Sequence, residues 1–251
     1  MTTRTLTILI LVSASGCRRA PAPVPVATAF GVAIVDASGE LPVANVGALI
    51  DRPLIAQVND ADGNGIAGAL VEFSASGGAQ LSPVSGLTGT DGQIATKVQL
   101  GGTSGRYPIV ATTHDKTGKP LHVAFTAIAL DYQQTLGREL SEKHCARCHD
   151  ARSTAERVSN LDNLSAQPHA FSDGATLNEI GPANLVAIVG HGGVAVGKSP
   201  EMPPYSPTLS AVEIDALAAY IRAVADPPYS PRGLVDANRT KPPPNRSDAG
   251  N

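Results

Sequence analysis

The feature that most constrains the fold is a change in the spacing of apolar residues near residue 130. Before this point, short segments alternate apolar and polar residues, and clusters rich in Gly, Asp and Asn separate them. After it, apolar residues recur at helical spacing. A period of two predicts half-buried strands, whereas intervals of three and four predict helices. The 251 residues are therefore expected to form two domains, an all-β domain followed by an all-α domain.

Composition narrows the classes of protein further. Apolar residues make up 42% of the chain and charged residues 16%, which is enough apolar material for packed cores and excludes a wholly disordered chain. The formal net charge is −3, so the basic footprint of a nucleic-acid-binding protein is missing and no nucleic-acid partner is expected.

The segment 30–130 carries the strand signals. The clearest alternating stretches are Phe30–Val35, Leu54–Val58, Leu70–Phe73, Ile94–Leu100, Ile109–Thr113 and Val123–Ile128. Roughly seven strands at intervals of about 8–12 residues predict a β-sandwich. The order of the segments Leu54–Asp60, Asp62–Gly68, Val71–Phe73, Thr90–Gln93 and Gly105–Tyr107 resembles bacterial Ig-like domains of the invasin/intimin type. The resemblance implies a rigid spacer or adhesion module and no catalytic role.

The N-terminal residues 1–17 have the pattern of an export signal. Arg4 precedes an apolar run over 6–12, which is too short for a membrane-spanning helix of about 20 residues. Ser15 and Gly16 are small residues before Cys17, and this order resembles the bacterial lipobox, whose Cys becomes the first mature residue and carries lipid. The alternative is an ordinary secretory signal with an incidental Cys.

A Pro-rich tether follows over residues 18–29, as an anchored domain would need to stand clear of a membrane. Arg18 and Arg19 stand where an inner-membrane retention signal would have Asp. The expected location is therefore the cell envelope, with the chain lipid-anchored at the outer membrane and facing the periplasm or the cell surface.

The segment 131–228 carries the chemistry, in the motif Cys145-Ala146-Arg147-Cys148-His149. C-x-x-C-H is the pattern of c-type haem attachment. Two thiols three residues apart on a helical turn can each add to one vinyl group of the same macrocycle, and the next residue can offer its imidazole to the iron. The expected cofactor is one covalent haem c, with Cys145 and Cys148 as thioethers and His149 as an axial ligand. A redox dithiol and half of a zinc site are the alternatives.

The second axial ligand is predicted to be Met202. It is the only methionine besides Met1, and it lies in the Pro-rich stretch Ser199–Tyr205. A thioether is a soft ligand for haem iron, and Met/His ligation is typical of electron-transfer cytochromes c. A surface position for Met202, an open sixth site, or His169 or His191 as the ligand are the alternatives.

Two helices are expected around these motifs, Tyr132–Lys143 before them and a second after the capping box Ser210–Glu213. The second helix is predicted to end before Pro227-Pro228 and to place Val212, Leu217, Tyr220, Ile221 and Val224 near one face. A further helix is predicted over Ala183–Val189, with Pro182 in its first turn after Gly181.

Together these residues resemble class I monohaem cytochrome c over about 100 residues. The pieces that carry the resemblance stand in the family's order: Gly137-x-x-Leu140, the Cys145–His149 motif, Gly190–Gly193, Met202–Tyr205 and Leu217-x-x-Tyr220-Ile221. It implies that the first and last helices cross, that Gly137 lets them approach closely, and that His149 is proximal and Met202 distal. Ser141 departs from the pattern, because the family usually has an aromatic residue there.

The resemblance also implies that a proline carbonyl holds the ring of the proximal histidine. Pro168 is the first candidate and Pro182 the second.

The expected function is that of a single-electron carrier with no small-molecule substrate and no enzymatic activity. The segment 130–228 has seven basic and twelve acidic residues, so a redox protein with a basic patch is the expected partner. The alternatives are a cell-surface adhesion or scaffold lipoprotein with an accessory haem, and an open-site haem enzyme or sensor. The Pro-rich tail 229–251 shows no apolar period and is predicted to be disordered.

Overall fold

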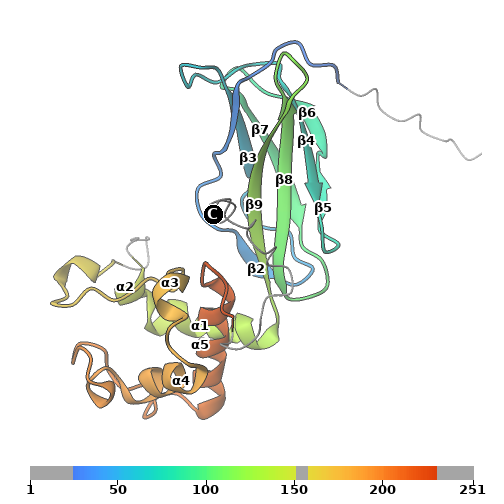
Figure 1. Ribbon diagram of the computed structural model, residues 1–251. Helices are drawn as coiled ribbons and strands as arrows, with labels where there is room; N and C mark the ends of the chain where they lie inside the picture. Colours follow the sequence, from blue (N-terminus) through green and yellow to red (C-terminus); the bar gives the residue numbers. More distant parts are fainter. Residues whose placement is uncertain (1–24, 151–157, 231–251) are drawn as a thin grey trace, which may run out of the picture.

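The computed structural model describes residues 25–150 and 158–230. The predictions for the signal peptide, for Cys17 and for nearly all of the C-terminal tail concern residues outside this part. A β-sandwich and a group of helices lie end to end along the long axis of the molecule (Figure 1). Among the residues described, no helix is long and apolar enough to cross a membrane.

Two sheets form the sandwich. The strands are β1 Ala33–Asp36, β2 Val43–Asn45, β3 Leu54–Asn59, β4 Leu70–Ala75, β5 Gln80–Ser82, β6 Ser85–Leu87, β7 Gln93–Gln99, β8 Gly105–His114 and β9 Pro120–Leu130. One sheet has the order β1-β3-β7-β5 and the other the order β2-β9-β8-β4-β6. The hairpin of β8 and β9 is paired over ten positions, from Gly105↔Ala129 to His114↔Pro120, and β2 adds to it in parallel.

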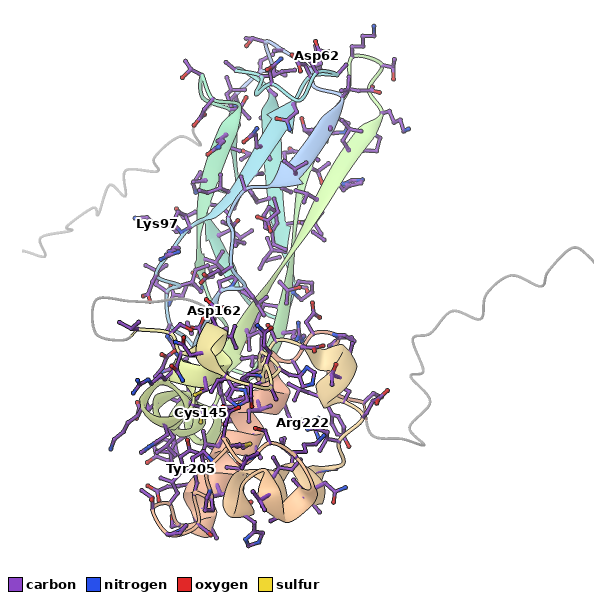
Figure 2. The ribbon with its side chains drawn as sticks, turned by 90° about the vertical axis from the view of Figure 1, so that its left-hand side faces the viewer. Asp62, Lys97, Cys145, Asp162, Tyr205 and Arg222 are labelled. Atoms are coloured by element: carbon purple, nitrogen blue, oxygen red, sulfur yellow. The ribbon has the colours of Figure 1, made fainter. Side chains whose placement is uncertain are left out.

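The core of the sandwich follows from the alternation seen in the sequence. Leu54, Val58, Val71 and Ile109 are at most 1% exposed and face one another between the sheets. The turn that contains Asp62 lies at one end of the sandwich, and the helical part with Cys145, Tyr205 and Arg222 lies at the opposite end (Figure 2). The all-β, Ig-like prediction for this half is therefore confirmed.

The helices follow β9 almost directly. They are α1 Tyr132–His144, α2 Ala146–His149, α3 Gly174–Leu177, α4 Pro182–His191 and α5 Ala211–Val224, with 3-10 turns η1 Leu161–Asn163 and η2 Val194–Val196. Asp131 caps α1 by accepting a hydrogen bond from the Gln134 N–H, at 2.9 Å. The predicted capping box of α5 is also present, since Ser210 and Glu213 bond each other's backbone N–H groups.

The first and last helices meet at a glycine, as the resemblance implied. A Cβ atom on Gly137 would lie 2.0 Å from the Ala216 carbonyl oxygen, so only glycine allows this approach of α1 to α5. Ser141, at the position where the family usually has an aromatic residue, is 5% exposed, so this position is buried although its side chain is small. The prediction for Val212 is wrong, because its side chain is 68% exposed, whereas Leu217, Ile221 and Val224 are buried.

The two halves share a packed junction. Ile128 and Leu130 at the end of β9 are at most 1% exposed and pack against Val224 of α5, together with Phe171 and Tyr220. Three hydrogen bonds and one ion pair add to it: Arg138 Nη1 to the Val43 carbonyl, Thr135 Oγ1 to Asn45 Oδ1, Arg106 Nη2 to the Ala225 carbonyl, and Arg106 Nη1 with Asp226 Oδ1 at 3.6 Å. The end of the sandwich is thus part of the base on which the helices pack.

Candidate functional site

The two thiols and the imidazole of the C-x-x-C-H motif line one cavity. The motif consists of Cys145, which joins α1 to α2, and of α2 itself, and the backbone N–H groups of Cys148 and His149 both donate to the Cys145 carbonyl, at 3.0 and 2.9 Å. This helical turn presents Cys145, Cys148 and His149 to a cavity of about 620 Å³. The volume lies within the range of about 300–1,000 Å³ of ligand and cofactor sites.

The chemistry of the thiols differs from that of a redox dithiol. Cys145 and Cys148 are not joined by a disulfide. Burial, followed by the proximity of Cys148, raises the pKa of the Cys145 thiol to about 12. Reactive dithiols have lowered thiol pKa values instead, so this electrostatic environment disfavours that alternative. The zinc alternative has no donor set in residues 25–150 and 158–230, where no group of three or more His, Cys, Asp or Glu side chains could hold a metal ion.

His149 is held as a neutral ring with one nitrogen available. Its Nδ1 donates a hydrogen bond to the His169 backbone carbonyl, at 2.8 Å, which leaves Nε2 without a proton. Burial is the main cause that lowers the pKa of this imidazole, so the ring is uncharged at neutral pH. Both effects favour metal ligation, since a metal binds the neutral form and a bond from the other nitrogen fixes the tautomer.

The prediction that the Pro168 carbonyl accepts the hydrogen bond from the His149 ring is wrong by one residue. The acceptor is the carbonyl of His169 and not that of Pro168, although Pro168 lies next to it and lines the cavity. Pro182 instead begins α4, as predicted. A backbone carbonyl is present at every residue, so no residue type in the sequence marks the one that turns toward His149.

Phe171 supports the same imidazole from the side. Its ring stacks on His149 with the ring centroids 4.7 Å apart and the planes inclined by 26°. Phe171 also packs against the junction formed by Ile128, Leu130 and Val224. The end of the sandwich therefore lies next to the residue that orients His149.

Met202 lies in a loop that packs tightly on the glycines following α4. The Gly193 N–H donates to the Met202 carbonyl at 3.0 Å. A Cβ atom on Gly192 would lie 2.8 Å from the Met202 carbonyl oxygen, and one on Gly193 would lie 2.0 Å from that of Ser199. Gly192 and Gly193 of the Gly190–Gly193 motif thus have a physical reason, because they let the loop approach and Met202 reach the cavity that His149 lines.

The other two candidate imidazoles are placed less suitably. His191 is exposed and does not line the cavity. His169 does line it, but its carbonyl binds His149 and its ring Nδ1 lies 3.2 Å from Asp173 Oδ2. Tyr205 connects the methionine loop to the motif, because its hydroxyl donates to the His144 carbonyl at 2.8 Å.

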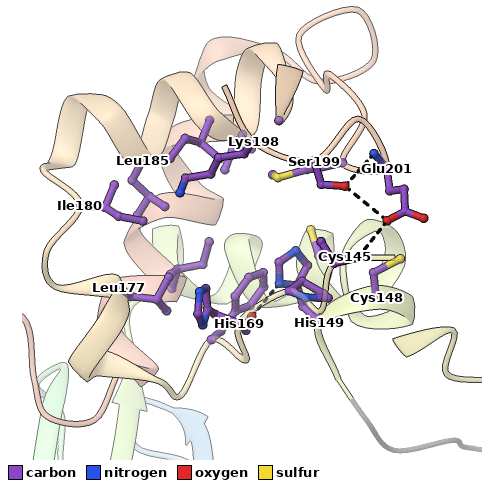
Figure 3. A pocket seen from close by; sticks show the side chains of 18 of the residues that line it. Cys145, Cys148, His149, His169, Leu177, Ile180, Leu185, Lys198, Ser199 and Glu201 are labelled. Carbon is purple, nitrogen blue, oxygen red and sulfur yellow. Dashed lines mark hydrogen bonds between the residues drawn. The ribbon is translucent and has the colours of Figure 1, made fainter. Parts of the chain in front are cut away.

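The cavity fits a haem. Cys145 and His149 lie on one side, and Lys198, Ser199 and Leu185 face them from the other (Figure 3). Most of the wall is apolar, as a flat macrocycle requires, and includes Leu164, Phe171, Leu177, Ile180, Leu185, Ile188, Val189, Leu217 and Ile221. Two thiols, one neutral imidazole and one thioether around one apolar space are the donor set that such a group uses.

Sequence reasoning missed two residues at this cavity, Phe171 and Glu201. Phe171 is one of only four phenylalanines in the chain, and its place between the motif and the glycines could have drawn attention to it. Glu201 binds the backbone of Ser165 and Ala166 across the cavity, and no signal in the sequence connects residues 36 and 35 positions apart.

Two family models match the β-sandwich and the helical part of the chain in turn. Residues 52–126 match the family of bacterial Ig-like domains (group 1), and residues 133–221 match the family described as cytochrome c oxidase, cbb3-type, subunit III. The chain therefore contains a bacterial Ig-like domain followed by a cytochrome c domain of the cbb3 type, a domain that implies haem c.

The solved structures that are similar include two of Intimin and one of an Escherichia coli adhesin. The D0-D1 domain of Intimin is 23% identical, with a TM-score of 0.32, and the match covers 41% of this chain and 49% of that one. The D00-D0 domain of Intimin is 21% identical, with a TM-score of 0.33 and coverages of 45% and 52%. The Escherichia coli adhesin FdeC is 23% identical, with a TM-score of 0.29 and coverages of 38% and 30%.

The chain thus spans about half the length of the two Intimin structures. No curated protein matches the chain.

Proposed function

We propose that the protein is an exported c-type cytochrome that carries single electrons through one covalently bound haem. The observation that carries this proposal is that Cys145, Cys148, His149 and Met202 line one largely apolar cavity. When bound, the haem supplies a one-electron couple, and Met/His ligation raises its potential.

The chain's own residues account for holding and orienting that group. Cys145 and Cys148 are its points of covalent attachment. His149 offers Nε2 because the His169 carbonyl occupies its other nitrogen. Met202 offers its thioether from a loop that the Gly193 N–H fixes. The apolar wall would limit the access of water to the bound group, which would favour electron transfer over reaction with solvent.

We further propose that lipid on Cys17 anchors the chain in the cell envelope, at the outer membrane, and that the Ig-like module acts as a spacer. The lipobox-like residues before Cys17 and the Pro-rich composition of 18–29 support this part of the proposal. The partner would be a redox protein with a basic docking patch, because the cytochrome domain has an excess of acidic residues.

Optical spectra test the proposed electron carrier, with the full chain produced in a host that has the haem c maturation machinery. We expect a c-type reduced spectrum and, in the oxidised protein, the far-red band of an iron–methionine bond. Met202→Ala should abolish that band and open the iron to added imidazole. His169→Ala and His191→Ala are the controls and should keep the band.

Two other results would contradict the proposal. A wild-type protein with covalent haem but no far-red band would favour an open-site enzyme or sensor. A protein without covalent haem would exclude the electron-carrier function and leave the adhesion or scaffold function as the alternative.

Labelling with a radioactive fatty acid tests the anchor. The wild-type chain should take up label and sediment with membranes, whereas Cys17→Ala should do neither. Equal labelling of both chains would refute lipidation at Cys17.

The dependence of electron-transfer rate on salt tests the partner. Oppositely charged surfaces steer association, and salt screens that attraction. The second-order rate with a basic redox partner should fall as ionic strength rises, and a rate indifferent to salt would argue against a basic patch.

A further inference from the structure

Glu201, the residue before Met202, makes an unusual set of hydrogen bonds for an exposed side chain. Its two carboxylate oxygens accept from the Ser165 N–H at 3.0 and 3.2 Å, and one of them also accepts from the Ser165 hydroxyl at 2.8 Å. The same oxygen lies 3.4 Å from the Ala166 nitrogen. The Ser199 hydroxyl donates to it at 3.3 Å and accepts from the Glu201 N–H at 3.2 Å, which orients the carboxylate.

These bonds join the two loops on either side of the cavity. Glu201 belongs to the loop that carries Met202. Ser165 and Ala166 belong to the segment that reaches His169, whose carbonyl holds the ring of His149. Ala166 and Glu201 both line the cavity, and in Figure 3 Ser199 and Glu201 lie across it from His149. We call the set of contacts between Glu201 and Ser165–Ala166 the loop latch.

The other hydrogen bonds of the methionine loop hold it to α4, to the residues after α4 and to the end of α1, where the Tyr205 hydroxyl donates to the His144 carbonyl. The Gly193 N–H holds the Met202 carbonyl, and the Tyr205 N–H donates to the Val189 carbonyl at 3.2 Å, so these contacts tie the loop to α4 and the residues after it. Among the residues that the structure describes, every hydrogen bond from this loop to the 164–168 segment involves Glu201.

We propose that Glu201 is a positioning residue that controls how often Met202 leaves the cavity, by latching its loop to the segment that supports His149. The proposal rests on the function proposed above, in which Met202 is an axial ligand. An ionised carboxylate suits this role because bonds from several donors to a charged acceptor are stronger than neutral ones. Glutamine keeps the shape of the side chain but loses the charge, and alanine loses every contact.

Imidazole binding to the oxidised full-length holoprotein tests the latch. Added imidazole reaches the iron only after Met202 has left, so the limiting rate at high imidazole reports the opening of the loop. We expect Glu201→Ala to raise this rate about tenfold and Glu201→Gln to raise it about threefold, from the strength of hydrogen bonds to a charged group at an exposed site.

Glu179→Gln is the matched control, because Glu179 is an exposed carboxylate that lines the same cavity and accepts no hydrogen bond from the described residues. Its limiting rate should equal that of the wild type. An unchanged rate in Glu201→Ala would overturn the proposal, and so would an equal increase in Glu179→Gln, which would trace the effect to charge alone.

Amide hydrogen exchange separates this proposal from the function on which it rests. The amides of Ser165 and Ala166 donate to Glu201, so their exchange should become about tenfold faster in Glu201→Ala and stay unchanged in Glu179→Gln. If the wild-type protein lacks the far-red band, the methionine ligand is wrong and exchange alone decides the latch. Unchanged exchange at both amides in Glu201→Ala would overturn the latch, whatever the ligand of the iron.

Discussion

At the scale of single residues, the site depends on glycines, which have no side chain, as much as on the side chains that line the cavity. Gly137 allows α1 to meet α5, and Gly193 allows the methionine loop to meet α4. The sequence could single out Cys145, Cys148 and Met202, which line the cavity, because cysteine and methionine are rare in this chain. It could not identify the His169 carbonyl, since a backbone oxygen leaves no trace in the residue type.

Gly137→Ala tests the close approach of the helices. The new Cβ atom would meet backbone at 2.0 Å, and backbone cannot swing aside as a side chain can. We expect a loss of about 2–3 kcal/mol in the free energy of unfolding, at the upper end of overpacking effects. Denaturant titration followed by far-UV circular dichroism measures it.

Gly190→Ala is the matched control for that substitution. Gly190 also lies within a helix, α4, but a Cβ atom there would be 3.7 Å from Ile214 Cδ1, an ordinary contact. Since alanine favours a helix over glycine by about 1 kcal/mol, this variant should be as stable as the wild type or more so. A loss of equal size in both variants would show that helix packing at Gly137 is not the cause.

At the scale of elements, the sequence predicted the long strands and helices and missed the short ones. β2, β5 and β6 have three residues each, too few to show alternation. The end of β9 breaks the alternation for a different reason. Ala127, Ile128, Ala129 and Leu130 are all buried, because one face meets the sandwich core and the other meets the helices. A strand buried on both faces has no period to detect.

The capping box of α5 makes stability depend on pH. The Glu213 carboxylate accepts from the Ser210 N–H and hydroxyl, both at 2.8 Å, and these bonds lower its pKa below the ordinary value of 4.5. A lowered pKa in the folded state means that the stabilisation is present above pH 4.5 and is lost as the pH falls through the folded pKa.

Glu213→Gln measures this contribution. Wild type should have the higher Tm above pH 4.5, and the difference should disappear at lower pH. Asp215→Asn, an exposed carboxylate on the same helix and outside the capping box, should show no such difference. A difference between wild type and Glu213→Gln that is constant with pH would contradict the assignment.

At the scale of the whole molecule, the two domains are packed against each other and are not joined by a linker alone. Ile128 and Leu130 of the sandwich are covered by Val224, Phe171 and Tyr220 of the helical domain. A chain reduced to the cytochrome domain would therefore lose the sandwich residues that pack against Phe171, and Phe171 stacks on His149. The sequence could not predict this junction, because its parts lie more than 90 residues apart at contacts such as Arg138 with Val43.

Arg106→Ala tests the junction. The Arg106 side chain is 23% exposed and connects β8 to the Ala225 carbonyl and to Asp226, just after the end of α5. We expect the sandwich and the haem domain to unfold in one transition, and the variant to lose about 1 kcal/mol, a value reduced for partial exposure. Haem absorbance and far-UV circular dichroism should be recorded on the same sample.

Lys97→Ala is the control for charge, because Lys97 is exposed on the sandwich away from the helices (Figure 2). It should leave the transition unchanged. Separate unfolding of the two signals in the wild type would refute the shared junction.

The joint between the domains has a geometric consequence. β9 ends at Leu130 and α1 begins at Tyr132, so a single capping residue, Asp131, connects a strand of 11 residues to the haem-binding helices. At about 3.4 Å per residue, that strand is an arm of about 37 Å. The first described residues enter at its far end (Figure 1). On the proposed lipid anchor, this arm would add its length to that of the tether, so that the sandwich separates the helices from the membrane and leaves room there for a redox partner.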